Sequence, residues 1–262
     1  MKKNFLEEMR GLPEGRRLGA YFLFCLAATL LVTGAALLDR NNGLPPLSLG
    51  AKALAGVGAL LLAGRAARIP LRNRPLLPWL ILISLIAPAV YLAFRLGPVS
   101  LTPGPEQIGV TLLGIGLTAF WEECVFRLWG RLLFEEEGKY KARDFLAVAV
   151  TFGAMHLVNL LTSDPGSVIL QAAFATLTAL FLQTIYTRSG SLLLVILIHA
   201  LINASQQLPE LWVAVKDRFL VRQGGLDLIL TALFFAVSAA VITRRGGLIL
   251  RGKPFLKLGK KK

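Results

Sequence analysis

Cysteine is nearly absent from this sequence of 262 residues. The two that occur, Cys25 and Cys124, lie within apolar stretches and have the spacing neither of a disulfide framework nor of a metal site. Cys124 directly follows Glu123, so a thiolate nucleophile is conceivable, but an uncharged helical environment favours the thiol as a small buried apolar group. The sequence therefore argues against disulfide-rich and cysteine-ligated classes of protein.

Charged residues are also few. They make up 17% of the chain, while 55% of the residues are hydrophobic and the mean hydropathy is +0.64. Soluble proteins carry about 25% charged residues, so this composition excludes an ordinary soluble domain. Lysine and arginine outnumber acidic residues 29 to 15, which gives a formal net charge of +14. Because the basic residues cluster between apolar runs and at the chain ends, we expect no nucleic-acid partner.

Long apolar runs recur along the whole chain. About 20 apolar residues cross a bilayer as a helix, and turn-forming groups such as Asp164-Pro165-Gly166 separate the runs. We therefore predict an all-α, polytopic membrane helix bundle, with an interfacial N-terminal segment at 1–17, a transmembrane domain at 18–243 and a basic tail at 244–262. The predicted domain has about eight transmembrane helices, at residues 18–38, 49–64, 76–95, 107–130, 144–162, 167–187, 190–207 and 225–243.

The distribution of lysine and arginine orients this bundle. With the N-terminus inside, the inner segments hold 22 basic residues and the outer segments hold six. Basic residues concentrate on the cytoplasmic side of membrane proteins. The sequence thus predicts that both termini are cytoplasmic and that the membrane is the inner membrane if the source is bacterial. The basic tail is predicted to determine this topology, with some attraction to anionic lipid.

Ionisable side chains lie inside several predicted spans, where each costs at least about 2.5–3.5 kcal/mol. Glu123 and Arg127 are four residues apart on one helix, the favoured order for an ion pair, and pairing reduces the cost of both charges. Glu122 points about 100° away around that helix and has no local partner. A desolvated carboxylate without a cation binds a proton more tightly, which suits a general base. We therefore assign Glu122 to chemistry and Glu123 with Arg127 to a structural ion pair.

The two histidines of the chain, His156 and His199, also lie within apolar stretches. His199 and Asn203 share a helical face, and an imidazole with an amide makes a plausible donor pair for an oxyanion. Counted at 1.5 Å per residue, Glu122, His156 and His199 lie at depths that agree within about 10 Å. Taken singly, each histidine could simply bond a neighbouring helix, and Asn203 could be a packing residue. Their joint occurrence favours a catalytic site with Glu122, His156, His199 and Asn203.

Three motifs follow one another in the chain: Glu122-Glu123-x-x-x-Arg127, Phe152-x-x-x-His156 and His199-x-x-x-Asn203. Over about residues 118–203 they resemble the CPBP family of intramembrane proteases, which includes CAAX prenyl endopeptidases of Rce1 type and bacterial Abi and bacteriocin-immunity relatives. The resemblance implies a motif-bearing core at about 107–207.

By this resemblance, Glu122 with His156 would activate the attacking water, and His199 with Asn203 would stabilise the oxyanion. Members of the family are often classed as metalloendopeptidases. Glu122, His156 and His199 could supply three zinc ligands and leave one position open. The chain has no His-Glu-x-x-His helix, however, and a metal-free mechanism needs no further residues. We favour the metal-free alternative, with a divalent metal such as zinc as the other.

The predicted function is that of an intramembrane endopeptidase. Its expected partners are the lipid bilayer and a membrane-embedded or membrane-anchored protein or peptide, and this class includes lipidated substrates of CAAX type. Two alternatives from other classes are a non-catalytic scaffold or bacteriocin-immunity factor, and a proton-coupled carrier that uses glutamate and histidine as a relay. The carrier is less favoured because the chain has no clear inverted repeat.

Overall fold

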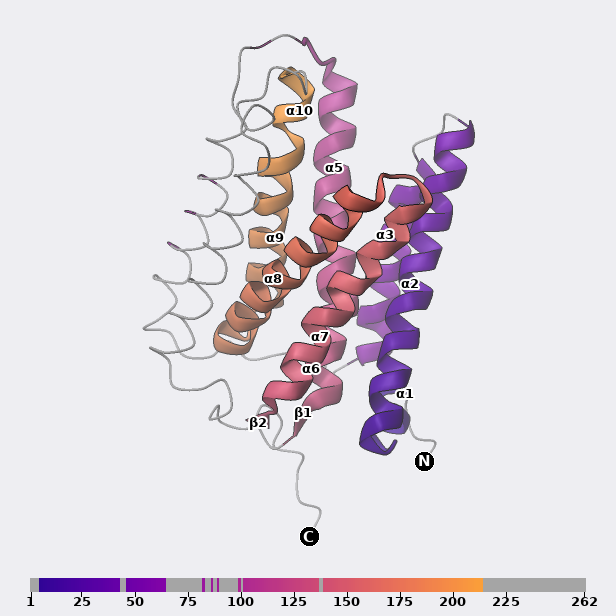
Figure 1. The fold of residues 1–262 in the computed structure, drawn as a ribbon, viewed down its shortest axis with the longest axis vertical. Coiled ribbons are helices and arrows are strands. Elements are labelled where there is room, and N and C mark those ends of the chain that lie inside the picture. The colour runs from indigo at the N-terminus through magenta and orange to yellow at the C-terminus, as the bar shows by residue number, and fades with distance from the viewer. Residues whose placement is uncertain are drawn as a thin grey trace.

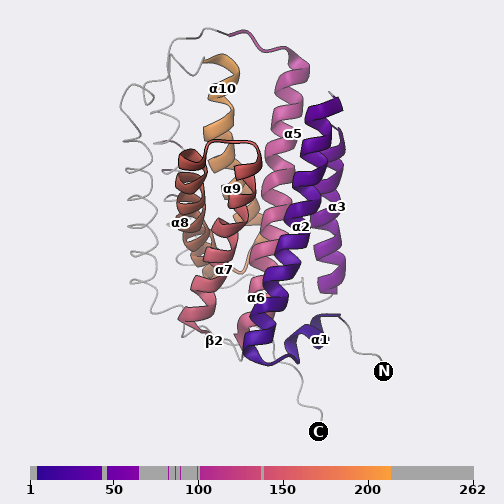
Figure 2. The same ribbon diagram turned by 45° about the vertical axis from the view of Figure 1, so that its right-hand side comes forward.

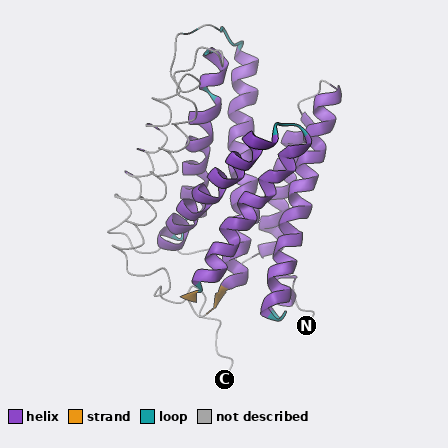
Figure 3. Ribbon diagram, in the orientation of Figure 1, coloured by secondary structure: helices purple, strands orange, loops and turns teal. Residues whose placement is uncertain are grey.

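The computed structural model describes residues 5–42, 46–64, 101–136 and 139–213, with four isolated positions between residues 65 and 100. Figure 1 shows a bundle of long helices, and Figure 3 shows that the strands of the described residues form one short hairpin at an end of it. The described elements, in chain order, are α1 (Phe5–Arg10), α2 (Glu14–Asn42), α3 (Pro46–Ala63), α5 (Pro105–Glu122), the π-helix η2 (Glu123–Leu128), α6 (Trp129–Phe134), β1 (Glu135–Glu136), β2 (Lys139–Tyr140), α7 (Ala142–Met155), the 3₁₀-helix η3 (His156–Leu161), α8 (Pro165–Ser189), α9 (Leu192–Gln207) and α10 (Pro209–Trp212).

Within the described residues, five helices are long and apolar enough to cross a bilayer, and α3 is a shorter apolar helix. Together they match six of the eight predicted spans, which confirms a helical bundle apart from the β1–β2 hairpin. The predicted spans 76–95 and 225–243 and the tail 244–262 lie outside the described residues. The total of eight spans and the cytoplasmic location of both termini stay predictions. The five long helices are Glu14–Arg40, Pro105–Phe134, Arg143–Leu161, Pro165–Thr187 and Leu192–Trp212.

Local sequence signals account for where α8 begins and ends. The Asp164 carboxylate accepts hydrogen bonds from the backbone N–H groups of Ser167, at 2.8 Å, and Gly166, at 3.2 Å, and Pro165 occupies the first turn. These hydrogen bonds, that of Ser167 first, hold the pKa of the exposed Asp164 carboxyl below its usual range. At the other end, Gly190 adopts the left-handed conformation with φ of 72°, which glycine tolerates. The α7–α8 hairpin therefore follows from sequence.

The helix from Pro105 to Phe134 is the centre of the bundle. Figure 2 shows α2 and α3 on one side of it and α7, α8 and α9 on the other. Its middle section is the π-helix η2, in which every residue is buried. The hydroxyl of Tyr21 on α2 donates to the carbonyl of Phe126 at 3.0 Å, and the indole N–H of Trp129 donates to Ala59 of α3 at 3.0 Å. A π-turn is rare and often marks a functional site.

Close packing joins α7 to α8 around Gly153. A Cβ atom at this glycine would lie 1.9 Å from Oγ1 of Thr176 and 2.7 Å from the backbone oxygen of Ala172. Small residues let membrane helices approach closely where the hydrophobic effect does not drive them together. Gly153 therefore fixes the spacing of α7 and α8, three residues before His156.

Replacing Gly153 by alanine is expected to lower the free energy of unfolding by about 1–3 kcal/mol, because the methyl group meets backbone as well as a side chain. Thermal unfolding in detergent measures the change. Gly116→Ala on α5 is the matched control, since nothing lies within 4 Å of its added Cβ. Equal melting temperatures for the two variants would contradict the close contact.

Candidate active site

A cavity of about 400 Å³ opens into the bundle between α2, α3, α5, α7, α8 and α9. Its lining includes all four residues that the sequence proposes for catalysis: Glu122, His156, His199 and Asn203. Glu122 is the last residue of α5, His156 begins η3, and the other two lie one turn apart on α9. Residues as far apart in the chain as positions 122 and 203 thus meet in one place.

Four ionisable side chains form a connected series that begins with Glu122 and His199 at the floor of the cavity and continues into the bundle through Glu123 and Arg127. Nη1 of Arg127 lies 3.2 Å from Oε1 of Glu123, and both side chains are fully buried. The same Oε1 lies 2.6 Å from Nδ1 of His199. Nε2 of His199 in turn lies 3.4 Å from Oε2 of Glu122. The ion pair expected from spacing is therefore present, and it continues through His199 to Glu122.

The charges of these four side chains limit where a proton can lie. A buried site disfavours net charge. The charges of the Arg127 guanidinium and an ionised Glu123 cancel. Glu122 and His199 are then neutral as a pair when one proton is shared between the Glu122 carboxyl and Nε2 of His199. That proton lies either on Nε2 of His199 or on the carboxyl of Glu122. Because Nδ1–H of His199 donates to Glu123, only Nε2 faces Glu122 and the cavity.

This arrangement differs from the pairing expected from the sequence. Glu122 was paired with His156 and His199 with Asn203, whereas in the structure the imidazole beside Glu122 is that of His199. Among the described residues, no hydrogen bond joins Glu122 to His156. Glu123 also has a second task beyond its ion pair, since it fixes the orientation and tautomer of His199.

His156 is held from its own helix. Nδ1–H of its imidazole donates to the carbonyl of Phe152 at 2.9 Å, which leaves Nε2 as a proton acceptor in the neutral ring. The Phe152 ring lies 4.9 Å from the His156 ring and 6.1 Å from that of His199. The guanidinium carbon of Arg127 lies 3.8 Å from the Phe152 centroid, within cation–π range. Phe152 therefore contacts both imidazoles and shields the buried cation.

Other polar groups in the wall are available to a ligand. Asn203 lines the cavity, and within the described part of the chain its side chain makes no hydrogen bond. The indole N–H of Trp121 and the hydroxyl of Thr178 are buried, line the same cavity and have no partner among the described residues. Buried donors are normally satisfied, so groups of this kind suit a bound peptide backbone.

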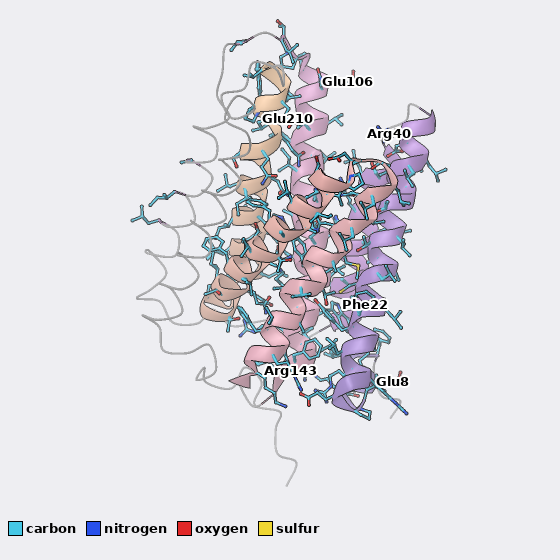
Figure 4. All side chains as sticks on the ribbon, in the orientation of Figure 1. Glu8, Phe22, Arg40, Glu106, Arg143 and Glu210 are labelled. Atoms are coloured by element: carbon cyan, nitrogen blue, oxygen red, sulfur yellow. The ribbon has the colours of Figure 1, made fainter. Side chains whose placement is uncertain are left out.

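The cavity widens away from this floor. Glu122 and His199 are buried, whereas Arg40 and Gln171 at the other end of the lining are exposed. Figure 4 places Arg40 near the end of the bundle opposite to Glu8. The mouth therefore lies toward the end of the bundle where α2 connects to α3.

The candidate metal ligands do not converge. Across the described residues, no three side chains of histidine, cysteine, aspartate or glutamate are close enough together to hold a metal ion. Glu122, His156 and His199 are thus not arranged as a three-ligand site, and Nδ1 of His199 is occupied by Glu123.

Two contributors to the site were missed by sequence analysis. Lys52 of α3 lines the cavity, although we counted it as an outer basic residue. The contact of Phe152 with Arg127 was also unexpected, although Phe152 lies in the second motif. A lysine inside an apolar run was the available signal for the first; no sequence signal marks the second, because the two residues lie on different helices.

Comparison with known proteins agrees with these motifs. Residues 104–205 match the family described as type II CAAX prenyl endopeptidase Rce1-like, and the match covers all three motifs. No curated protein and no solved structure matches the chain. The family resemblance is thereby confirmed over this segment. Together with five long apolar helices, it identifies an integral membrane protein.

Proposed function

We propose, from the match of residues 104–205 to the Rce1-like family, that the chain is an intramembrane endopeptidase acting on membrane-anchored substrates. The observation that carries the proposal is the cavity in which Glu122, His156, His199 and Asn203 meet above a charge-balanced ion pair. Ionisable groups are costly in a membrane unless they are paired or used. Hydrolysis is the chemistry that this set of acceptors and donors fits.

The proposed reaction uses these residues in two groups. Glu122 accepts a proton from a water molecule, with Nε2 of His156 as a second acceptor, while the water oxygen attacks the peptide carbonyl carbon. The oxyanion accepts hydrogen bonds from the Asn203 amide and from Nε2–H of protonated His199. Collapse breaks the C–N bond, and the proton on Glu122 passes to the leaving amine. Glu123 acts through His199 and is a positioning residue.

No step of this scheme passes through a metal, which leads to a testable expectation. The purified protein should bind less than about 0.1 equivalent of zinc, and treatment with a chelator such as EDTA should change kcat/KM less than about twofold. Elemental analysis measures the first quantity, and peptide cleavage before and after dialysis measures the second. Stoichiometric zinc, with activity lost on its removal and restored on its return, would contradict the scheme.

The direction of the cavity bears on substrate access. Its mouth lies toward the end of the bundle where α2 connects to α3. In Figure 1 this end is opposite to α1. With the N-terminal end in the cytoplasm, as the basic residues predict, that mouth is on the outer side of the bilayer. A substrate anchored in the inner leaflet would then enter sideways between helices. The assay should therefore offer substrates from both sides of the membrane.

The test uses the full chain reconstituted in liposomes. Two quenched fluorescent peptides are compared, one with a farnesylated cysteine three residues before its C-terminus and one with unmodified cysteine. Cleavage by the wild type, mapped by mass spectrometry, and its loss in His199→Ala would support the proposal. Glu106→Gln, at the exposed start of α5 (Figure 4), is the control for a substitution away from the proposed catalytic residues.

A non-catalytic scaffold would predict a different outcome. Its cellular phenotype should survive substitution of Glu122 and of His199, with no change in the membrane proteome. Loss of the phenotype together with accumulation of an uncleaved membrane protein would support the endopeptidase.

A further inference from the structure

Two polar side chains of α8 are buried outside the active-site cavity. Gln183 and Tyr186 are both 0% exposed, and neither lines the cavity. Among the described residues, the amide oxygen and nitrogen of Gln183 and the hydroxyl of Tyr186 have no hydrogen-bond partner. Buried polar groups are almost always hydrogen-bonded, because an unpaired one keeps the full cost of its desolvation. These two side chains therefore indicate a ligand.

Tyr186 lies among the charges of the central helix. Nη1 of Arg131 donates to the backbone carbonyl of Tyr186 at 2.9 Å, and the guanidinium carbon lies 4.8 Å from the centroid of the phenol ring. Nε of Arg131 pairs with Oε2 of Glu135 at 2.6 Å. The phenol interacts electrostatically with this ion pair and also with Glu123 of the active-site series. Tyr186 thus connects the two buried ion pairs of the helix.

Gln183 lies one turn before Tyr186 on the same helix. Residues three apart on a helix are neighbours, with Cβ atoms about 5–6 Å apart. Long side chains lean toward the N-terminus of their helix, so the phenol ring lies over the turn that carries Gln183. Because α8 runs from the mouth of the cavity toward the β1–β2 hairpin (Figure 1), this is the side of Tyr186 nearer the active site.

Glu123 has one oxygen that the active site does not use. Its Oε1 lies 2.6 Å from Nδ1 of His199 and 3.2 Å from Nη1 of Arg127. Its Oε2 is buried and has no hydrogen-bond partner in the described part of the chain. An ionised carboxylate can only accept hydrogen bonds, whereas a phenol and an amide can both donate and accept. Water can bridge groups of these kinds, since it donates two hydrogen bonds and accepts two.

We propose that Gln183 and Tyr186 bind internal water that also donates to Oε2 of Glu123, and that both are positioning residues for His199. An internal water typically makes about three hydrogen bonds to buried groups that are otherwise unsatisfied. The amide, the phenol and the carboxylate oxygen supply these three. The water holds the Glu123 carboxylate in place, and Glu123 in turn holds the imidazole of His199. The water site does not depend on the proposed function, whereas its effect on turnover rests on it.

Radiolytic hydroxyl labelling tests the water site directly, because radicals formed from a bound water oxidise the side chain beside it even where bulk solvent has no access. Tyr21 is the matched control: it is also 0% exposed, but its hydroxyl donates to the carbonyl of Phe126 at 3.0 Å. Tyr186 is expected to be oxidised at least about fivefold faster than Tyr21, and in Gln183→Met the two rates should differ less than about twofold. Equal rates for the two tyrosines in the wild type would overturn the proposal.

Melting temperatures distinguish a hydrated site from a dry one. Gln183→Met and Tyr186→Phe keep the shape of each side chain and remove its hydrogen-bonding groups. If the groups bind water, both variants should melt about 2–4 °C below the wild type in detergent. If the groups are dry, each substitution removes an unpaired polar group, and the melting temperature should rise. A rise in both variants would overturn the proposal.

Peptide cleavage tests the positioning role. Gln183→Met and Tyr186→Phe should each lower kcat by about tenfold and leave KM within about twofold, because they act through Glu123 and not on the substrate. Thr184→Val is the matched control, since Thr184 is equally buried on α8 but its hydroxyl already donates to the carbonyl of Leu180 at 2.7 Å. This variant should keep kcat within about twofold of the wild type. An equal loss of kcat in all three variants would contradict the positioning role.

The two kinds of measurement separate this inference from the proposed function. If the wild type cleaves no peptide but Tyr186 is oxidised faster than Tyr21, the endopeptidase assignment fails and the water site stands. If it cleaves peptides and the two tyrosines are oxidised equally slowly, the endopeptidase stands and the water site fails.

Discussion

Glu122→Gln is expected to lower kcat/KM for peptide cleavage by about 100-fold to 10,000-fold. General base catalysis contributes about 10²–10⁴-fold, and an amide of the same shape can hydrogen-bond but cannot take the proton from water. The substitution also removes the acceptor that shares a proton with His199. Single-turnover cleavage of a quenched peptide in liposomes measures the loss, and KM should change little because a general base acts in the transition state.

Two controls bound this result. The Glu122→Gln protein should melt within a few degrees of the wild type, since Glu122 is not part of the Glu123–Arg127 ion pair. Glu106→Gln should retain full activity. If Glu122→Gln kept more than about a tenth of wild-type activity, Glu122 could not be the general base, and Nε2 of His156 would be the remaining acceptor in the cavity.

Much of this site follows from short-range spacing. The pairing of Glu123 with Arg127 and the common face of His199 and Asn203 depend only on helical periodicity, which the sequence displays directly. The turn at Asp164-Pro165 depends on capping chemistry that is equally local. Hydropathy located six of the helices for the same reason, because a membrane requires each of them to be apolar along its own length.

The contacts that the sequence did not reveal are those between helices. Whether His199 faces Glu122, Glu123 or neither depends on how α9 rotates against η2, and periodicity carries no information on that angle. The π-turn of η2 adds to the difficulty, because it departs from the 100° per residue on which the separation of Glu122 from Glu123 was based. The sequence could therefore propose which residues take part, but not their pairing.

Lys52 illustrates a related difficulty. Charge counting treats every lysine near a span end as a topology signal, and six residues from the start of α3 it was assigned to the outer side. Its place in the cavity depends on which face of α3 meets α5, and that is set by Gly56, whose missing side chain admits the ring of Phe120. Charge counting thus interpreted Lys52 as a topology signal, whereas the packing of α3 on α5 places it in the cavity wall.

Arg127→Leu is expected to lower the free energy of unfolding by about 3–5 kcal/mol, since removing one partner of a buried ion pair leaves the other charge uncompensated. Both Arg127 and Glu123 have fully buried side chains, so water cannot take the place of the missing partner. The variant also loses the contact with the Phe152 ring. Unfolding in mixed micelles of SDS and a mild detergent, followed by tryptophan fluorescence, measures the change.

The double variant Glu123→Gln with Arg127→Leu isolates the electrostatic part of this loss. It contains no unpaired charge, so it should recover at least about half of the stability that Arg127→Leu loses. It should nevertheless remain nearly inactive, because glutamine cannot hold a protonated His199 as a carboxylate does through Nδ1. Recovery of stability without recovery of activity would show that the ion pair serves two purposes: it neutralises a charge within the membrane, and it keeps Nε2 of His199 directed at Glu122. If the double variant were no more stable than Arg127→Leu, the lost free energy of unfolding would instead come from packing against Phe152.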